Sequence, residues 1–146
     1  MPRSRNTPGP GPRFGFGDDA AAICANGNGF DQTGKKIIPG TLTWEALYCF
    51  DSYPYAAPVG KFIPNQFGLH DMLGNAKEWT ADCYHEVVGY RGAPIDGSAW
   101  TSGDCRQHVQ RGGSWLSYPR IVRVSYRSTN VPVYRNFLIG LRCVGD

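Results

Sequence analysis

The sequence lacks any long hydrophobic run. No apolar stretch in its 146 residues approaches the ~18 residues that a membrane-spanning helix needs. The N-terminus also lacks the apolar core of a secretory signal peptide, so we expect no membrane partner. The opening twelve residues, MPRSRNTPGPGP, show no hydrophobic periodicity. We therefore expect a disordered leader at 1–12, followed by one folded domain at 13–146.

The sequence also has little net charge and no metal-binding cysteine spacing. Its formal charge is +3 at pH 7, and the basic residues are scattered among glycines and aromatics, so we expect no nucleic-acid partner. The five cysteines show no C-x-x-C spacing, which argues against a zinc site. His70, His85 and His108 lack the i, i+4 spacing of paired metal ligands, and we interpret them as lone surface or loop residues.

Glycine, proline and aromatic residues are what the sequence has in quantity. Nineteen Gly and eleven Pro argue against long helices, and a 13% aromatic content must supply much of the packing. We therefore expect an irregular, loop-rich α+β fold. The expected elements are a helical turn at 20–24, turns over 25–36, a short helix at 43–47, a long loop from 80 to 104, and strands at 121–127 and 137–144.

One stretch in the middle of the chain contains a local signal for a site. Gly74 and Asn75 are suited to a positive φ, and Asp71 and Glu78 stand on either side of this break. Two carboxylates, together with the turn carbonyls of Gly74 and Ala76, are the oxygen ligands that Ca²⁺ takes. The alternative is a helix or turn start in which Asp71 caps backbone N–H groups and Glu78 is a solvated residue beside a core Trp.

Four of the five cysteines can be paired in sequence order. The pairs Cys24–Cys49 and Cys83–Cys105 would each close a loop of about 25 residues and contribute about 3 kcal/mol. Four cysteines permit three pairings, and buried free thiols are the alternative. Cys143 is left over. Paired cysteines would indicate an oxidising compartment such as the periplasm or the extracellular space.

Three blocks of the sequence resemble the signature of a known family. They are N-x-F-G-L-x-D-M-x-G-N-x-x-E-W at 65–79, Arg-Gly-Gly-Ser-Trp at 111–115 and Ile-Gly-Leu-Arg at 139–142. In this order they resemble the formylglycine-generating enzymes, also called sulfatase-modifying factors. The resemblance covers residues 13–146 and the C-terminal half of the family's domain. It implies a partial domain of the formylglycine-generating-enzyme type, which is C-type-lectin-like.

The resemblance implies structural calcium at two places. The first ligand set would be the side chains of Asn28 and Asp51 and the carbonyls of Gly29 and Tyr53. The second would be the set around Asp71 described above. Asp71 stands where the family also uses asparagine, and its added charge should strengthen cation binding.

The resemblance also implies a chemistry whose residues are missing. The family oxidises a substrate cysteine to formylglycine with O₂ and a copper ion held by two cysteines. The first lies three residues after the serine of Gly-Gly-Ser, where this chain has Ser117; the second lies five residues further on, in a segment that reads Pro-Arg-Ile-Val at 119–122. Neither a hydroxyl nor an aliphatic side chain is the soft ligand that Cu(I) requires. We therefore expect no copper and no catalytic residue of this kind.

Two functions of different class follow. One is a non-catalytic binding or accessory module, stabilised by calcium and disulfides, that presents aromatic and arginine side chains to a protein or peptide partner. Its candidate face consists of Trp100, Tyr118, Arg120, Arg123 and Tyr126, and the alternative is that most of the aromatic residues fill the core. The alternative is an oxidoreductase that forms formylglycine, or does related O₂ chemistry, with other residues. Apolar surface meant for a missing half would favour self-association.

Overall fold

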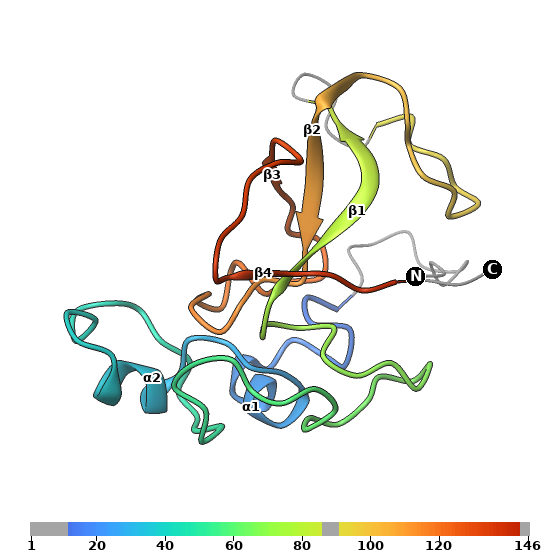
Figure 1. Ribbon diagram of the computed structural model, residues 1–146. Helices are drawn as coiled ribbons and strands as arrows, with labels where there is room; N and C mark the ends of the chain where they lie inside the picture. The colour runs from blue at the N-terminus through green and yellow to red at the C-terminus, as the bar shows by residue number, and fades with distance from the viewer. Residues whose placement is uncertain (1–11, 86–90, 144–146) are drawn as a thin grey trace.

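The structure is a computed structural model and describes residues 12–85 and 91–143 (Figure 1). The helices are a 3-10 turn η1 (Ala20–Ala22), α1 (Ile23–Asn26) and α2 (Gln32–Ile37). The strands are β1 (Lys77–Tyr84), β2 (Asp104–Arg111), β3 (Ser128–Asn130) and β4 (Ile139–Gly140). The expected irregular α+β class is confirmed. The leader predicted at 1–12 lies outside the described residues, apart from Pro12.

The strands form one sheet of mixed direction in the order β3-β2-β1-β4. Glu78 of β1 lies opposite Arg111 of β2, and the pairing of β1 with β4 is parallel. The register shifts after Trp79 and again after Cys83. Such irregularities increase the twist of a strand, which accounts for the curl of β1 in Figure 1. The disulfide between Cys83 and Cys105 joins the two strands at this curl.

The helices begin where an aspartate can cap them. Asp19 Oδ1 accepts a hydrogen bond from Ala21 N at 2.9 Å, which starts η1 and confirms the helical turn expected at 20–24. Asp31 Oδ1 accepts from Gly34 N at 2.8 Å and starts α2. The prediction of turns alone over residues 25–36 was wrong, because this cap stabilises the six-residue helix α2 within that segment. Neither these nor the other described helices are long and apolar enough to cross a membrane.

Two of the expected elements are absent where they were predicted. The segment 121–127 is not a strand; turn hydrogen bonds such as Ile121 N to Tyr118 O, at 2.9 Å, hold its backbone, and Val122 is fully buried in the core. The segment 43–47 is not a helix, because Leu47 N donates to the distant Phe30 O at 2.8 Å. Packing decided both segments against their local preference.

The loop predicted at 80–104 and the strand predicted at 137–144 are both present, but with other bounds than expected. The loop expected from 80 to 104 begins later, because β1 continues to Tyr84 and pairs with β2; residues 86–90 lie outside the described part. The strand expected at 137–144 is reduced to β4, which pairs with β1 at only two positions. Both differences arise from pairing between strands far apart in sequence, which no local pattern reports.

The turn at Gly74 and Asn75 joins several segments of the chain. Both residues have positive φ, +74° and +60°, as their sequence predicted. Asn75 N donates to Asn28 O at 2.7 Å, Asn75 O accepts from Trp115 N at 3.0 Å, and the Asn75 amide pairs with the Ala57 backbone in both directions. A Cβ on Gly74 would lie 1.7 Å from Asn28 O, so only glycine fits.

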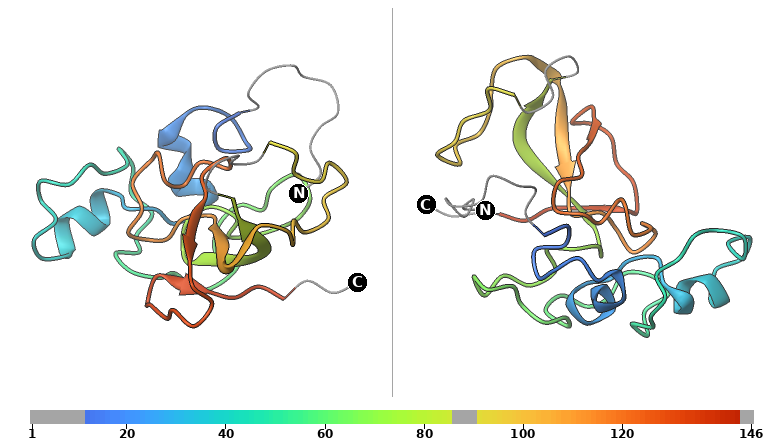
Figure 2. Two further views of the ribbon diagram at one scale, coloured as in Figure 1. Left: turned by 90° about the horizontal axis from the view of Figure 1, so that it is seen from above. Right: turned by 180° about the vertical axis from the view of Figure 1, so that it is seen from behind.

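The hydrophobic core is small and includes Leu73, which directly precedes this turn. Its buried cluster consists of Phe14, Ile23, Leu47, Leu73 and Val122. Figures 1 and 2 show α1 and α2 beyond one end of the sheet, so in the described part the helices do not cover a sheet face. The core is therefore assembled from loops around α1, and its stability depends on long-range contacts.

Both expected disulfides are confirmed. Cys24 bonds to Cys49 and Cys83 to Cys105, and Cys143 is a free, exposed thiol. Cys24 and Cys49 both pack against the core cluster, so this bond connects α1 to the irregular segment that follows α2. In a chain with so little regular structure, a bond across about 25 residues removes much of the freedom of the unfolded state.

Large apolar side chains are exposed on the same irregular segment. Leu42, Tyr48 and Phe50 are 73%, 91% and 72% exposed, and Trp44 is 45% exposed. Exposed apolar surface, where it is contiguous, is typical of association sites. It is the kind of surface that the expectation of self-association requires, and the association itself stays a prediction.

Candidate functional site

The first predicted calcium set lies where two segments meet. Asn28 Nδ2 donates to Tyr55 O at 2.8 Å, and Asp51 N donates to Asp31 Oδ2 at 2.7 Å. The segments 28–31 and 51–55 are thus hydrogen-bonded at both ends. Gly29 follows Asn28 in the chain. Tyr53 is held by its own N–H, which donates to Asp51 Oδ1 at 2.7 Å.

Two oxygen atoms of this set are buried without a partner. Asn28 is 0% exposed and its Oδ1 has no hydrogen bond; Asp51 is 8% exposed and its Oδ2 has none. A buried polar atom left in this state is destabilising. Both atoms are of the kinds that Ca²⁺ takes as ligands, an amide oxygen and a carboxylate oxygen. The residues of the first set therefore fit calcium.

The Asp51 carboxyl is also perturbed electrostatically. The pKa of Asp51 is raised to about 7, chiefly by burial; the hydrogen bond from Tyr53 N–H lowers it, and the negative charge of Asp31 and a hydrogen bond with that carboxyl raise it. Near neutral pH and without a cation, the ionised form of Asp51 is thus unfavourable in the folded chain. A bound divalent ion would reverse this preference.

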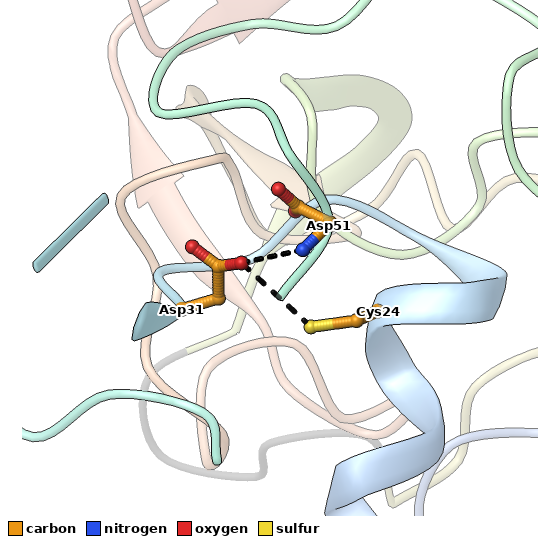
Figure 3. Close-up of side chains that lie close together, drawn as sticks. All are labelled: Cys24, Asp31 and Asp51. Atoms are coloured by element: carbon orange, nitrogen blue, oxygen red, sulfur yellow. Dashed lines mark hydrogen bonds between the residues drawn. The ribbon is translucent and has the colours of Figure 1, made fainter. Parts of the chain in front are cut away.

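A second acidic residue, Asp31, lies beside this set (Figure 3). Oxygens of Asp31 and Asp51 and the Cys24 sulfur lie within 4.8 Å of one another. Cys24 is not a thiolate here, because it forms the disulfide with Cys49. Asp31 is 0% exposed, and its Oδ2 accepts from Asp51 N at 2.7 Å and Thr33 Oγ1 at 2.9 Å.

The second predicted set has a different environment. Glu78 is held by Arg142, whose Nε lies 2.9 and 3.0 Å from the two carboxylate oxygens. This hydrogen-bonded pairing raises the pKa of Arg142. The same guanidinium donates to His70 O at 2.9 Å, so it links β1, the chain after β4 and the loop before Asp71.

Asp71 itself retains one free oxygen. Its Oδ2 accepts from Gly60 N at 2.7 Å, and its Oδ1 is buried without a partner. Gly74 and Ala76 lie in the turn between the two acids. Asp71 fits a cation, whereas Glu78 already has a positive partner, so the second set fits calcium only in part. Calcium at this set stays a prediction.

Comparison with known proteins identifies the family. The family model described as "Sulfatase-modifying factor enzyme 1-like domain" matches residues 20–146. The chain belongs to the sulfatase-modifying factor family. It is 34% identical over 105 residues to the formylglycine-generating enzyme of Bos taurus. This alignment covers 66% of this chain and 26% of the relative. It is 31% identical over 122 residues to the "Inactive C-alpha-formylglycine-generating enzyme 2" of Bos taurus, covering 75% of this chain and 35% of that protein.

A solved structure of the family type is also similar. PvdO from Pseudomonas aeruginosa superposes with a TM-score of 0.64 at 35% identity, over 82% of this chain and 38% of that one. The chain spans about a quarter to a third of the length of the curated relatives described above. It therefore shares the fold of part of the sulfatase-modifying factor domain.

The two positions that the resemblance assigns to the family's catalytic cysteines lie together in this chain. Counting from the Gly-Gly-Ser motif, they are Ser117 and Val122. A Cβ built on Gly113 would lie 2.9 Å from Val122 Cγ1 and 3.4 Å from Ser117 Cβ, so both side chains approach the same glycine. Both are buried, and Ser117 Oγ accepts from Ser114 N at 3.0 Å. The fold thus brings the two positions together, with a hydroxyl and an isopropyl group in place of two thiols.

The predicted binding face is divided. Trp100 stacks on His85 before β2, with ring centroids 3.5 Å apart. Arg120 lies over the Tyr118 ring after β2, 4.9 Å from its centroid, and Arg123 Nε donates to Arg120 O. Trp100 O accepts a hydrogen bond from Cys83 N of β1 at 2.8 Å, near the Asp104 end of β2, whereas Tyr118 and Arg120 follow the Arg111 end of that strand. Trp100 therefore does not share a face with the arginine and tyrosine group, to which Tyr126 is joined through its N–H to Arg123 O.

Two residues of these sites escaped the sequence analysis. Asp31 lies in a segment that we interpreted as turns. Aspartate is a preferred residue at the position just before a helix, and this preference is the sequence signal that could have identified Asp31 as the cap of α2. Arg142 was noticed only as part of the closing motif. Its partner Glu78 lies 64 residues away in sequence, and no local signal connects the two.

Proposed function

We propose that this member of the sulfatase-modifying factor family is a calcium-stabilised binding or accessory module without the family's copper chemistry. The observation that carries the proposal is the pair Ser117 and Val122. The fold holds these positions side by side, yet they offer no soft, anionic atom to Cu(I).

The structural part of the proposal rests on the first calcium set. The unpartnered oxygens of Asn28 and Asp51 come from segments that little regular structure connects. An ion bound between them would act as a cross-link of the native state. It would stabilise the chain by RT ln(1 + [Ca²⁺]/Kd), about 2.7 kcal/mol at a hundredfold excess over Kd.

The binding part of the proposal rests on exposed side chains. Leu42, Tyr48 and Phe50 project from the segment that follows α2, and Arg120 with Tyr118 forms a separate group after β2. Aromatic and arginine side chains are enriched at the energetic centres of protein interfaces. A protein or peptide partner is the class of ligand that such surfaces suit.

The competing function is oxidation of a substrate cysteine to formylglycine, or related O₂ chemistry, by other residues. Similarity to a formylglycine-generating enzyme favours it, and similarity to a relative named inactive opposes it. One experiment separates the two functions. The chain is incubated with Cu(I), O₂ and a cysteine-containing sulfatase peptide, and aldehyde is captured with a hydrazide.

The expected result is no aldehyde above the peptide-only background. The Bos taurus formylglycine-generating enzyme serves as the positive control under the same conditions. Turnover by this chain that Ser117→Ala abolishes would overturn the proposal. Pull-down of the chain from solution by an immobilised second copy, lost on Tyr48→Ser, would show that the exposed segment binds another copy of itself.

A further inference from the structure

The first calcium set contains more negative charge than its predicted ligands account for. Asp31 and Asp51 are both buried, and in the described part of the chain neither forms an ion pair with a basic side chain. Buried charges without a partner are strongly unfavourable in a folded protein. A proton on Asp51 relieves this charge in the calcium-free chain, and a bound cation would relieve it in place of the proton.

Asp31 has the surroundings of an anion. Its two oxygens accept from three donors, namely Gly34 N, Thr33 Oγ1 and Asp51 N, at 2.8, 2.9 and 2.7 Å. A carboxylate is acceptor-only when ionised, so three donors match that form. One of the three donors is the backbone of the Asp51 ligand itself.

This last bond controls where Asp51 points. Asp51 N is held by Asp31 Oδ2, and Asp51 Oδ1 is held by Tyr53 N. With its backbone and one oxygen both constrained, Asp51 presents its remaining oxygen in a single direction, and that oxygen is the buried one without a partner. Residues that orient a metal ligand in this way change metal affinity without touching the ion.

We propose that Asp31, which lies outside the family's predicted ligand set, is a positioning residue of the first calcium site. It holds the Asp51 backbone, and its charge beside Asp51 matches the site to a divalent cation in preference to a monovalent one. The inference rests on the proposed calcium binding at Asn28 and Asp51. It assigns to Asp31 a role beyond capping α2.

The test is calcium binding by the chelator-treated chain, measured by titration calorimetry with CaCl₂ in the presence of NaCl at several concentrations. Asp31→Asn keeps an oxygen for the Gly34 cap but loses the charge and one acceptor. We expect calcium affinity to fall about 10- to 100-fold, and competition by Na⁺ to become stronger. Asp31→Ser, which also caps helices, should give the same result.

Matched controls separate positioning from stability. Asp19→Asn changes the cap of η1 and should leave calcium affinity unchanged. Asp71→Ala, made in parallel, removes the side-chain oxygens of the second set and identifies any heat that comes from it. Circular dichroism in EDTA confirms that each variant retains the wild-type spectrum before its affinity is compared.

The outcomes distinguish this inference from the proposed function. A wild-type chain that binds no calcium overturns both. If the wild type binds calcium and Asp51→Asn does not, but Asp31→Asn and Asp31→Ser both bind as the wild type does, then the calcium site stands and the role of Asp31 is refuted.

Discussion

Replacing Asp51 with asparagine should stabilise the calcium-free chain at pH 8, although it removes a predicted ligand. A pKa that rises from 3.8 to about 7 corresponds to about 4 kcal/mol against the ionised carboxylate in the folded state. Asparagine keeps an oxygen for Tyr53 N but leaves an amide N–H₂ in place of the unpartnered oxygen, at about 1–3 kcal/mol. The net gain expected is about 1–3 kcal/mol.

The direction of the pH dependence follows from the same pKa. Because the folded-state pKa of Asp51 lies above the unfolded value, the folded chain holds this proton more tightly. The contribution to stability is complete below about pH 4 and is lost as the pH rises through about 7. The advantage of Asp51→Asn over the wild type should therefore disappear at pH 4.

The assay is urea unfolding at pH 4 and pH 8, in EDTA and in saturating calcium. Calcium should stabilise the wild type at pH 8 more than Asp51→Asn, so the order of the two chains reverses. Asp96→Asn is the control: this aspartate is exposed, its pKa is lowered by hydrogen bonds from Ser98, and its replacement should bring no gain at pH 8. Equal stability of wild type and Asp51→Asn in EDTA at both pH values would refute the reasoning.

Three further predictions concern other parts of the chain. Gly74→Ala should destabilise by about 3 kcal/mol or more in chemical unfolding, because its Cβ meets Asn28 O, whereas Gly60→Ala, with a similar φ and open space, should lose only about 1–2 kcal/mol. Ser117→Cys combined with Val122→Cys should gain Cu(I) binding in a chelator-competition assay that neither the wild type nor Ser117→Cys shows; no gain would mean that the two positions cannot share an ion. Arg142→Ala should lower the free energy of unfolding by about 1–3 kcal/mol, because it leaves the Glu78 carboxylate without its partner. A change below about 0.5 kcal/mol is typical of ordinary surface substitutions and would contradict a structural role for this pair.

Predictions from the sequence succeeded where one residue type suits one backbone geometry. Gly74 and Asn75 adopt the positive φ that their short or absent side chains permit. Sequential pairing of Cys24 with Cys49 was likewise confirmed, since turn-rich chain between two cysteines lets them meet. These features depend on neighbours in sequence, and a sequence contains that information directly.

Predictions failed where a distant contact outweighed local preference. Alternation at 121–127 is typical of a strand, yet Val122 is needed in the core and the chain turns around it. Leu47 N donates a hydrogen bond to Phe30 O, and the segment 43–47 therefore does not form the predicted helix. In both cases burial and long-range hydrogen bonds exceed the small energies of local propensity.

The amino-acid sequence by itself determined the family, through its three motifs, and it placed Ser117 and Val122 where the resemblance expects thiols. Only the tertiary structure decided which acids have partners. It set Arg142 against Glu78 and Asp31 against the Asp51 backbone, and it left oxygens of Asn28, Asp51 and Asp71 buried and free. The reason is that hydrogen bonding and charge compensation depend on distances across the fold, which sequence separation does not specify.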